Sequence, residues 1–466
     1  MSSYVLSAAR LAGRGGIIDD GYVVVEGGRV AATGQGRPPA LDLPVVDLGQ
    51  VMLAAGYIDV HVHGGGGYEV NCATRDEVET SVRRMAEFHA THGTTALVAT
   101  TVSDSPEALR TAVEGVAAVA LSPDGPGTGA RVLGSHLEGP WISRSRAGAQ
   151  YPGALRPPSV EELTDLLALS RGTVRIVTLA PELDGATELI RAATAAGVVV
   201  SIGHTDADSD EAGAAFRAGA SHATHLFNAM APIHHRRPGP VAAALGDSRV
   251  YLEIIADGIH IHPTLISLVA TVAPDRLVLV TDAIGATGTS PGLHRLGPLE
   301  VLVEDGRAVL AEHHETVAGS VLTMDRAVAL AVHVAGVPLE VALRAASLHP
   351  ATQLGETTRG HLAEGADADI VLLDDELAVV GTLVGGRVVH DPAGLLHAVS
   401  SLSRPRSAPA AGTVPAQATG TVPAQATGSV LAQATGSVLA PAGGSVAGNG
   451  DDSLPGEPGG RPLAPL

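Results

Sequence analysis

The sequence predicts an α/β protein built around a (β/α)8 barrel, with a small β-sandwich domain and a disordered C-terminal tail. Apolar, strand-like segments alternate with amphipathic helical segments from about residue 56 to 355. Segments with the pattern of β-hairpins lie on both sides of that region, and a short repeat follows residue 398. Strand–helix alternation over roughly 250–300 residues is typical of a parallel α/β barrel.

The elements follow in this order. Residues 1–55 are predicted as the first part of the β-sandwich domain, with a hairpin over 21–30 that has glycines at its turn. Residues 56–355 are predicted as the barrel, with its clearest strands at 95–100, 174–179, 198–202 and 277–280. The clearest barrel helices are predicted at 75–92, 106–120 and 160–169. Residues 356–398 return to strand patterns, at 368–373 and 383–389, and are expected to complete the β-sandwich domain.

The last predicted segment, residues 399–466, contains an eight-residue repeat. The unit Gly412–Thr419 recurs from Gly420, Gly428 and, in degraded form, Gly436. It holds too few large apolar side chains to offset the entropy of ordering the chain. We therefore expect a disordered tail.

Composition excludes several classes of protein. A net charge of −20 without a basic stripe argues against nucleic acid or an anionic membrane as a partner. No apolar run is long enough to span a bilayer and the N-terminus lacks the pattern of a signal peptide, so we expect a cytoplasmic location. The single cysteine, Cys72, excludes an internal disulfide. The absence of lysine excludes a Schiff-base lysine, a Walker-type phosphate loop and a carbamylated lysine bridging two metals.

His61 and His63 stand two residues apart at the end of the apolar run 51–60. Alternate side chains of a strand point to the same face, so both imidazoles can bind one divalent ion. Gly64–Gly67 follow directly and leave the mouth of such a site open to a ligand. Alone, the pair is a weak signal, because two histidines near a strand end are common without a metal.

Four further predicted strands end in histidine or carboxylate side chains, and the carboxyl ends of barrel strands meet at one mouth. These groups are His136 and Glu138, His204, His222 and His225, and Asp282. A single such histidine is more often a core or rim residue than a ligand, but their recurrence at five strand ends predicts a metal site. Imidazole and carboxylate ligands suit Zn²⁺ or Fe²⁺, and we expect one or two divalent ions per subunit.

Seven motifs occur in the order and spacing of a known family, from about residue 4 to 392. They are His136-Leu137-Glu138-Gly139-Pro140, Gly203-His204-Thr205, 223–230, 234–239, 256–260, Thr281-Asp282-Ala283 and 318–324. In these motifs the chain resembles the N-acetylglucosamine-6-phosphate deacetylases of the amidohydrolase superfamily. The tail lies outside the resemblance.

The resemblance implies a metal centre. Glu138, His204 and His225 match the main metal ligands of that family. His61 and His63 match second-site ligands that occur in members with two metals, so the chain resembles the binuclear type, with Glu138 as the bridge. His136 and His222 are expected to orient ligands.

The resemblance also implies roles around the metals. Asp282 matches the general base, and Asn228 and Ala229 match positions that contact the sugar phosphate. Arg236 and His260 match phosphate-binding positions. The counterpart of Arg236 reaches into the neighbouring subunit's site, which implies a homodimer.

These roles imply hydrolysis of the acetamide of N-acetylglucosamine 6-phosphate, an amino-sugar phosphate, to glucosamine 6-phosphate and acetate. One alternative is a related N-acyl substrate, such as N-acetylgalactosamine 6-phosphate or an unphosphorylated N-acyl compound. Another is a catalytically inactive relative, but such proteins typically lose ligands, and none is missing here.

Gln150 departs from the family pattern, which usually has a histidine at this position of a flap. Its amide can donate one hydrogen bond to an oxyanion, but it can neither carry charge nor supply a proton. Glutamine is therefore either a tolerated substitute or the sign of a different substrate.

Overall fold

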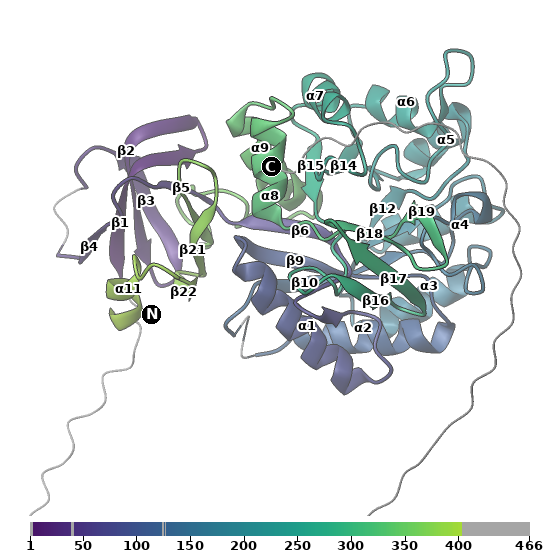
Figure 1. Ribbon diagram of the computed structural model, residues 1–466, viewed down its shortest axis with the longest axis horizontal. Helices are drawn as coiled ribbons and strands as arrows, with labels where there is room; N and C mark the ends of the chain where they lie inside the picture. The colour runs from purple at the N-terminus through teal and green to yellow at the C-terminus, as the bar shows by residue number, and fades with distance from the viewer. Residues whose placement is uncertain (1–2, 39–41, 124, 126, 403–466) are drawn as a thin grey trace, which may run out of the picture. The chain divides into compact units, whose positions relative to one another are not determined.

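The computed structural model describes residues 3–38, 42–123, 125 and 127–402 (Figure 1). Within them, eight parallel strands form the predicted barrel in the order β15-β14-β13-β12-β11-β10-β9-β6. Their bounds are β6 (Tyr57–Val62), β9 (Thr94–Thr101), β10 (Arg131–Glu138), β11 (Val174–Leu179), β12 (Val199–Ile202), β13 (His222–Ala223), β14 (Tyr251–Ile255) and β15 (Leu277–Val280). Most of their side chains are buried, as expected for a parallel sheet with both faces covered.

Hydrogen bonds close the barrel between its first strand, β6, and the chain that follows its last strand, β15. The backbone N–H of Asp282 donates to the carbonyl of His61 at 2.9 Å. The hydroxyl of Thr281 donates to the buried carboxylate of Asp59 at 2.5 Å, across 222 residues of sequence. The predicted (β/α)8 barrel is thereby confirmed.

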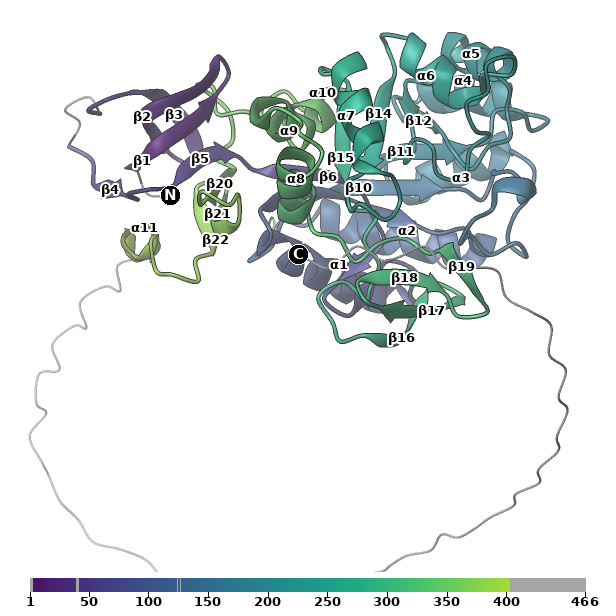
Figure 2. The ribbon, with the colours of Figure 1, turned by 45° about the horizontal axis from the view of Figure 1, so that its top comes forward.

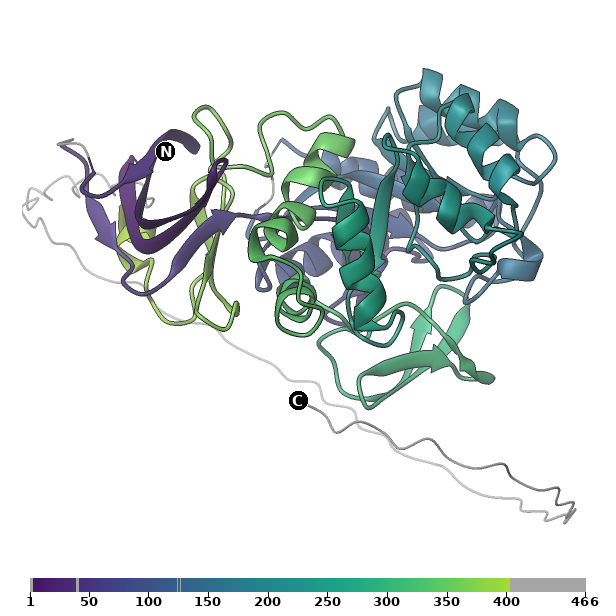
Figure 3. The same ribbon diagram turned by 90° about the horizontal axis from the view of Figure 1, so that it is seen from above.

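Helices pack around the outside of the barrel strands (Figure 3). They are α1 (Arg75–Ala90), α2 (Pro106–Ala120), α3 (Val160–Leu169), α4 (Ala186–Ala195), α5 (Ser209–Ala218), α6 (Gly239–Gly246), α7 (Pro263–Val272), α8 (Met324–His333), α9 (Leu339–Ala345) and α10 (Leu348–Gln353). Local sequence sets their starts: Thr74 and Glu77 form a capping box at α1, and Ser105 caps α2 just before Pro106. The predicted starts and ends of α2 and α3 are confirmed, whereas α1 ends two residues earlier than predicted.

Strands from both ends of the chain form one further sheet, seen in purple and yellow-green in Figure 1. Its order is β22-β21-β20-β5-β1-β2-β3, with β4 paired to β1. The strands are β1 (Tyr4–Gly13), β2 (Gly16–Glu26), β3 (Arg29–Gln35), β4 (Val45–Asp47), β5 (Met52–Ala55), β20 (Ile370–Leu373), β21 (Val379–Val384) and β22 (Arg387–His390). Antiparallel pairing of β5 with β20 joins the two chain ends, which confirms a small β-domain built from both.

A four-stranded antiparallel sheet that the sequence analysis did not predict lies in the chain between β15 and α8 (Figure 2). Its strands are β16 (Gly292–Leu296), β17 (Leu299–Glu304), β18 (Arg307–Leu310) and β19 (His313–Val317), and a two-stranded pair, β7 (Gly64–Gly65) and β8 (Tyr68–Glu69), follows β6. The turn Asp305-Gly306 between β17 and β18 is a strong hairpin signal.

The described chain ends in α11 (His397–Leu402), where Val399 is buried, so the first residues of the predicted disordered tail are helical instead. The remainder of the predicted tail, 403–466, lies outside the described residues. The predicted domain boundaries stay predictions. In the part of the chain that the structure describes, no helix is long and apolar enough to cross a membrane.

Candidate metal centre

Strands β6 and β10 place histidine and carboxylate side chains at one end of the barrel. His61 lies in β6, and His63 follows the strand directly. Glu138 is the last residue of β10. All three are buried, with at most 4% of their surface exposed. The carboxyl ends of these strands therefore supply three polar groups to a dry position.

Three more groups follow strands by two residues, where the chain turns. His204 follows β12, His225 follows β13 and Asp282 follows β15. Their φ angles are +48°, +27° and +50°, a region that side-chain-bearing residues rarely adopt. Strained backbone of this kind persists where the surrounding fold holds it and is concentrated at functional sites.

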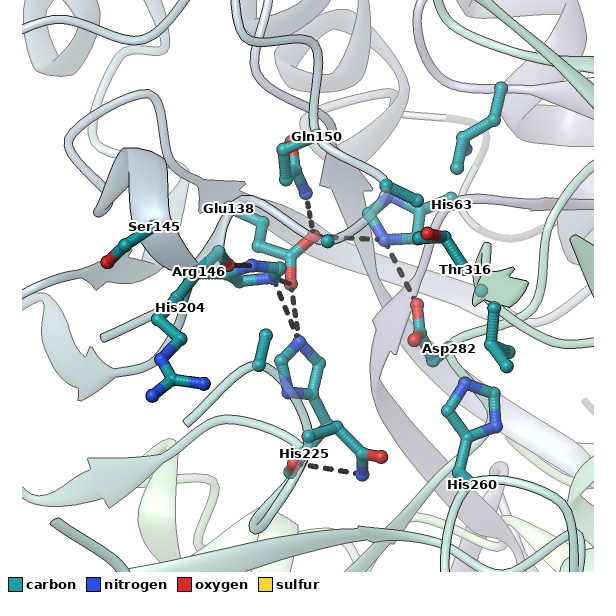
Figure 4. Close-up of a pocket in the computed structure, with 17 residues that line it drawn as sticks. His63, Glu138, Ser145, Arg146, Gln150, His204, His225, His260, Asp282 and Thr316 are labelled. Atoms are coloured by element: carbon teal, nitrogen blue, oxygen red, sulfur yellow. Dashed lines mark hydrogen bonds and ion pairs between the residues drawn. The ribbon is translucent and has the colours of Figure 1, made fainter. Parts of the chain in front are cut away.

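Five of these side chains form two triads that share Glu138, one with His204 and His225 and the other with His61 and His63. Figure 4 labels all of them except His61. Glu138 Oε1 lies 3.1 Å from His204 Nε2 and 3.0 Å from His225 Nε2. Glu138 Oε2 lies 3.2 Å from His63 Nε2, which in turn lies 3.2 Å from His61 Nε2. The ligand atoms of each triad all lie within 4.8 Å of one another.

Partners on the outer ring nitrogens decide which nitrogen faces inward. His63 Nδ1 lies 3.1 Å from the Thr100 carbonyl oxygen, and His204 Nδ1 lies 2.8 Å from that of Arg146. A carbonyl oxygen only accepts, so each Nδ1 donates and each neutral ring directs an Nε2 lone pair inward. His204 Nε2 lies 3.1 Å from His225 Nε2, and both nitrogens lie within 3.1 Å of Glu138 Oε1, so the three atoms are close enough to bind one cation. The donor set therefore fits a divalent cation at each triad.

The electrostatics of the cluster favour positive charge at the Nε2 atoms. Burial alone lowers the pKa of His61, but the nearby carboxylates, above all Glu138, raise it well above its usual value. Burial alone raises the pKa of Glu138, but the surrounding histidines lower it well below its usual value. The cluster thus stabilises a proton or a divalent cation at the same place.

Asp282 faces the triad of His61, His63 and Glu138. Its Oδ1 lies 3.1 Å from His63 Nε2 and 3.5 Å from His61 Nε2. Burial raises the pKa of Asp282, but the two histidines outweigh this effect and lower it. An ionised carboxylate at this position can accept a proton.

A cavity of about 310 Å³ opens beside the triads. His63, Glu138, His204, His225 and Asp282 line it, together with the predicted substrate residues Gln150, Asn228, Ala229 and His260. His61 lies behind this lining and is fully buried. The structure therefore brings together nearly all of the predicted site residues.

His260 and Arg236, the two predicted phosphate-binding residues, differ in their positions. His260 Nδ1 donates to Asp257 Oδ2 at 2.7 Å, and although burial lowers the pKa of His260, this carboxylate raises it overall. Arg236 lies on an exposed loop and is not part of the cavity lining of its own chain.

Gln150 differs from the expectation that its amide is free to bind an oxyanion. Its Oε1 accepts a hydrogen bond from the backbone N–H of Ser103 at 2.6 Å. Its Nε2 donates to Glu138 Oε2 at 2.5 Å. In this structure the amide therefore holds the carboxylate that the two triads share.

One buried group of the site, Glu253 in the middle of β14, was not predicted from the sequence. Its Oε2 lies 3.0 Å from His61 Nδ1. The signal was a charged residue within the apolar run Tyr251–Ile255, since an unpaired charge is rarely placed in a barrel core.

A parallel barrel with two histidine–carboxylate triads at its carboxyl mouth defines an α/β-barrel protein with a candidate metal centre. A sequence model of the Amidohydrolase family matches residues 52–389. The chain therefore belongs to the amidohydrolase family, whose members depend on metal ions.

Several curated and solved proteins are similar over most of their length. Human N-acetylglucosamine-6-phosphate deacetylase is 43% identical over 351 residues, covering 74% of this chain and 84% of the human protein. An N-acetylgalactosamine-6-phosphate deacetylase of Escherichia coli is 37% identical over 387 residues, covering 83% of this chain and 99% of that protein. A solved structure shows a mutant N-acetyl-D-glucosamine-6-phosphate deacetylase from Mycobacterium smegmatis in complex with N-acetyl-D-glucosamine-6-phosphate. Its sequence is 41% identical to this chain, and the two structures superpose with a TM-score of 0.77. It matches 84% of this chain and 100% of that one.

Proposed function

We propose that this protein hydrolyses the acetamide of N-acetylglucosamine 6-phosphate to glucosamine 6-phosphate and acetate. The observation that carries the proposal is Asp282, which faces the triad of His61, His63 and Glu138 at the cavity beside the two triads. The human and mycobacterial relatives, at 43% and 41% identity, support the substrate.

We infer that Glu138, His204 and His225 hold one divalent cation, and that His61, His63 and Glu138 hold a second. Imidazole and carboxylate ligands support Zn²⁺ or Fe²⁺. A cation bound there supplies Lewis acidity, which polarises a carbonyl oxygen and lowers the pKa of water from ~15.7 toward ~7.

Asp282 moves the protons of the proposed reaction. Its carboxylate accepts the proton that the attacking water loses as it adds to the acetyl carbonyl carbon. It then returns that proton to the amine nitrogen as the C–N bond breaks, so the amino sugar leaves as a neutral amine. The position of Asp282 at the cavity, 3.1 Å from His63 Nε2, supports both steps.

His260, Asn228 and Ala229 are proposed to contact the sugar phosphate from their positions in the cavity lining. Binding energy from a phosphate remote from the amide positions the reacting bond. The exposed loop position of Arg236 supports a role in the neighbouring subunit's cavity of a homodimer, through a bidentate contact with the phosphate.

The proposal is tested by measuring acetate release from N-acetylglucosamine 6-phosphate, with the metal content of the same sample. We expect turnover with one or two equivalents of zinc or iron. The variant Asp282→Asn should keep its metal and lose about 10²–10⁴-fold in kcat. A fully metal-loaded protein that releases no acetate would contradict the proposed activity.

Subunit sharing is tested by mixing two inactive variants, Arg236→Ala and Asp282→Asn. If Arg236 acts in the partner's site, hybrid dimers contain one site with both groups intact, and activity returns. If it acts within its own chain, every site in the hybrid lacks one group and the mixture stays inactive.

N-acetylgalactosamine 6-phosphate is a second candidate substrate, because the similarity to the Escherichia coli relative covers 99% of that protein. The two sugars differ only in the configuration of one hydroxyl. The ratio of their kcat/KM values in the same assay decides between them.

A further inference from the structure

Glu253 is a fully buried carboxylate that the proposed reaction does not use. It lies in β14 between Leu252 and Ile254, which belong to the apolar core. Its Oε2 lies 3.0 Å from His61 Nδ1 and accepts the backbone N–H of His225 at 3.1 Å. Its Oε1 lies 3.4 Å from His222 Nε2 and, within the described residues, has no hydrogen-bond partner.

The surroundings of Glu253 do not supply a permanent positive charge. Within the described part of the chain, its ion-pair partners are the imidazoles of His61 and His222. Isolated buried charges are strongly unfavourable, and a charge of this kind needs a compensating partner nearby. A cation held by the triad of His61, His63 and Glu138 would supply such a charge across the His61 ring.

The ring of His61 links Glu253 to the metal-binding triad. An ionised carboxylate only accepts hydrogen bonds, so His61 Nδ1 carries the proton and donates to Glu253. The other nitrogen, Nε2, then presents its lone pair to His63 Nε2 at 3.2 Å and to Glu138 Oε1 at 3.4 Å. A carboxylate behind a ligating histidine fixes the ring's tautomer and orientation and increases the basicity of the ligating nitrogen.

This contact is specific to one triad. His63 and His204 direct their outer nitrogens to backbone carbonyl oxygens, those of Thr100 and Arg146. His61 is the one ligand of the described cluster whose outer nitrogen faces a carboxylate. Glu253 touches the other triad only through the backbone N–H of His225.

We propose that Glu253 is a positioning residue for the second cation, the one held by His61, His63 and Glu138. It orients His61 and adds a negative charge at the ring's Nδ1, the side that faces away from His63 and Glu138. This proposal depends on the metal assignment above, but not on the identity of the substrate.

The test is a zinc titration of the purified, full-length protein against a competing chelator, without substrate. Wild type is expected to bind two equivalents of Zn²⁺. Glu253→Gln keeps an oxygen that can accept from His61 and His225 but removes the charge, so the second equivalent should bind about 10–100-fold more weakly. Glu253→Leu removes the hydrogen bond as well and should abolish the second equivalent, while the first changes less than about threefold.

Glu182→Gln is the matched control. Glu182 accepts hydrogen bonds from Thr205 and Asp206, next to His204, and touches no ligand ring of the His61 triad. This variant should bind both equivalents as wild type does. The Tm values of the metal-free variants and wild type are compared as well. Equal Tm values show that weaker zinc binding does not come from a general loss of stability.

Three outcomes would overturn the proposal. Glu253→Gln could bind both zinc equivalents equally more weakly, or bind both as tightly as wild type does. Glu182→Gln could lose affinity for the second equivalent to the same extent as Glu253→Gln. The titration contains no substrate. If wild type releases no acetate but Glu253→Gln still loses the second zinc equivalent selectively, the proposed activity alone is refuted. A wild type that turns over substrate with a single equivalent would refute the second-cation proposal and leave the activity standing.

Discussion

Gln150 lies at the predicted cavity, but its contacts within the folded protein were not predicted from the sequence. Its position predicted that it would line the cavity, and it does. Its amide, however, is held between the Ser103 N–H and Glu138 Oε2. Since the backbone N–H of Ser103 can only donate, the amide oxygen must face it, and the NH₂ group must face Glu138.

We expect Gln150→Met, which has similar volume and neither hydrogen bond, to weaken the binding of both zinc equivalents. The reason is that Glu138 belongs to both triads, and loss of a group that orients a ligand typically costs 10–100-fold in metal affinity. Chelator competition measures the effect, with Gln50→Met, at an exposed position, as the control. Unchanged affinity together with unchanged kcat would mean that Gln150 only fills space.

At the residue scale, positions at strand ends were sufficient to predict that His61, Glu138, His204 and Asp282 lie together, and their roles in a metal site stay predictions. The outer contacts could not be predicted in this way. The bond between Glu253 and His61 joins residues 192 positions apart, and only the closed barrel brings them together. The proposed contact of Arg236 with a phosphate could not be predicted from this chain alone either, because it involves a second subunit.

At the scale of elements, a glycine in β10 sets the register of the strand that carries Glu138. The pairing of β10 with β9 shifts between Val132 and Gly134, and its pairing with β11 shifts after Ser135. Gly134 has φ +139°, and a Cβ atom there would lie 1.9 Å from the Thr173 carbonyl oxygen. Such bulges re-aim the side chains that follow them.

We expect Gly134→Ala to destabilise the fold by about 2–5 kcal/mol, from backbone strain plus the clash, and to weaken zinc binding through displacement of Glu138. Gly172→Ala is the matched control, because Gly172 also has a positive φ, +78°, but open space around it. It should cost only about 1–2 kcal/mol. Denaturant unfolding of both variants measures the difference, and equal losses would show that the clash is relieved.

Element prediction succeeded where periodicity and caps agreed and failed where the pattern was short. The bounds of α2, α3 and β11 were predicted to the residue. The strand β13 has only two residues, too few for any alternation, and was identified only through its histidines. The sheet β16–β19 was missed because its alternating segments lie within a region assigned to a barrel of parallel strands.

At the scale of the whole molecule, the metal centre joins strands from around the barrel. We expect removal of metal with a chelator to lower Tm by several degrees, because a cation that binds only the folded protein at 100 times its Kd stabilises it by ~2.7 kcal/mol. Differential scanning calorimetry before and after chelation measures this, and restored zinc should reverse it. An unchanged Tm after verified metal loss would contradict a role in holding the strands together.

Buried neutral histidines away from the metals are expected to make the fold sensitive to acid. Burial lowers the pKa of His89 to about 4 and also lowers the pKa of His349. The unfolded pKa is ~6.5, so between pH 6.5 and 4 the unfolded chain binds more protons, and stability falls as pH falls.

For His89 the loss reaches about 3 kcal/mol at pH 4. The variants His89→Gln and His349→Asn, whose amides can still donate to the carbonyls of Gly64 and Leu277, should show a smaller decrease in Tm between pH 7 and 5 than wild type. An identical decrease would show that these histidines do not titrate in this range.

The bonds that close the barrel also impose an order in time on its assembly. Asp59 and its partner Thr281 are separated by 222 residues, and synthesis at about 5–20 residues per second places roughly 10–45 s between their appearance. During that interval β6 is the edge of an open sheet, with unpaired backbone groups that invite pairing with other chains. His61 and His63 are among the first site residues to be made, yet Asp282, which faces their triad, is among the last, so the site is completed late in synthesis.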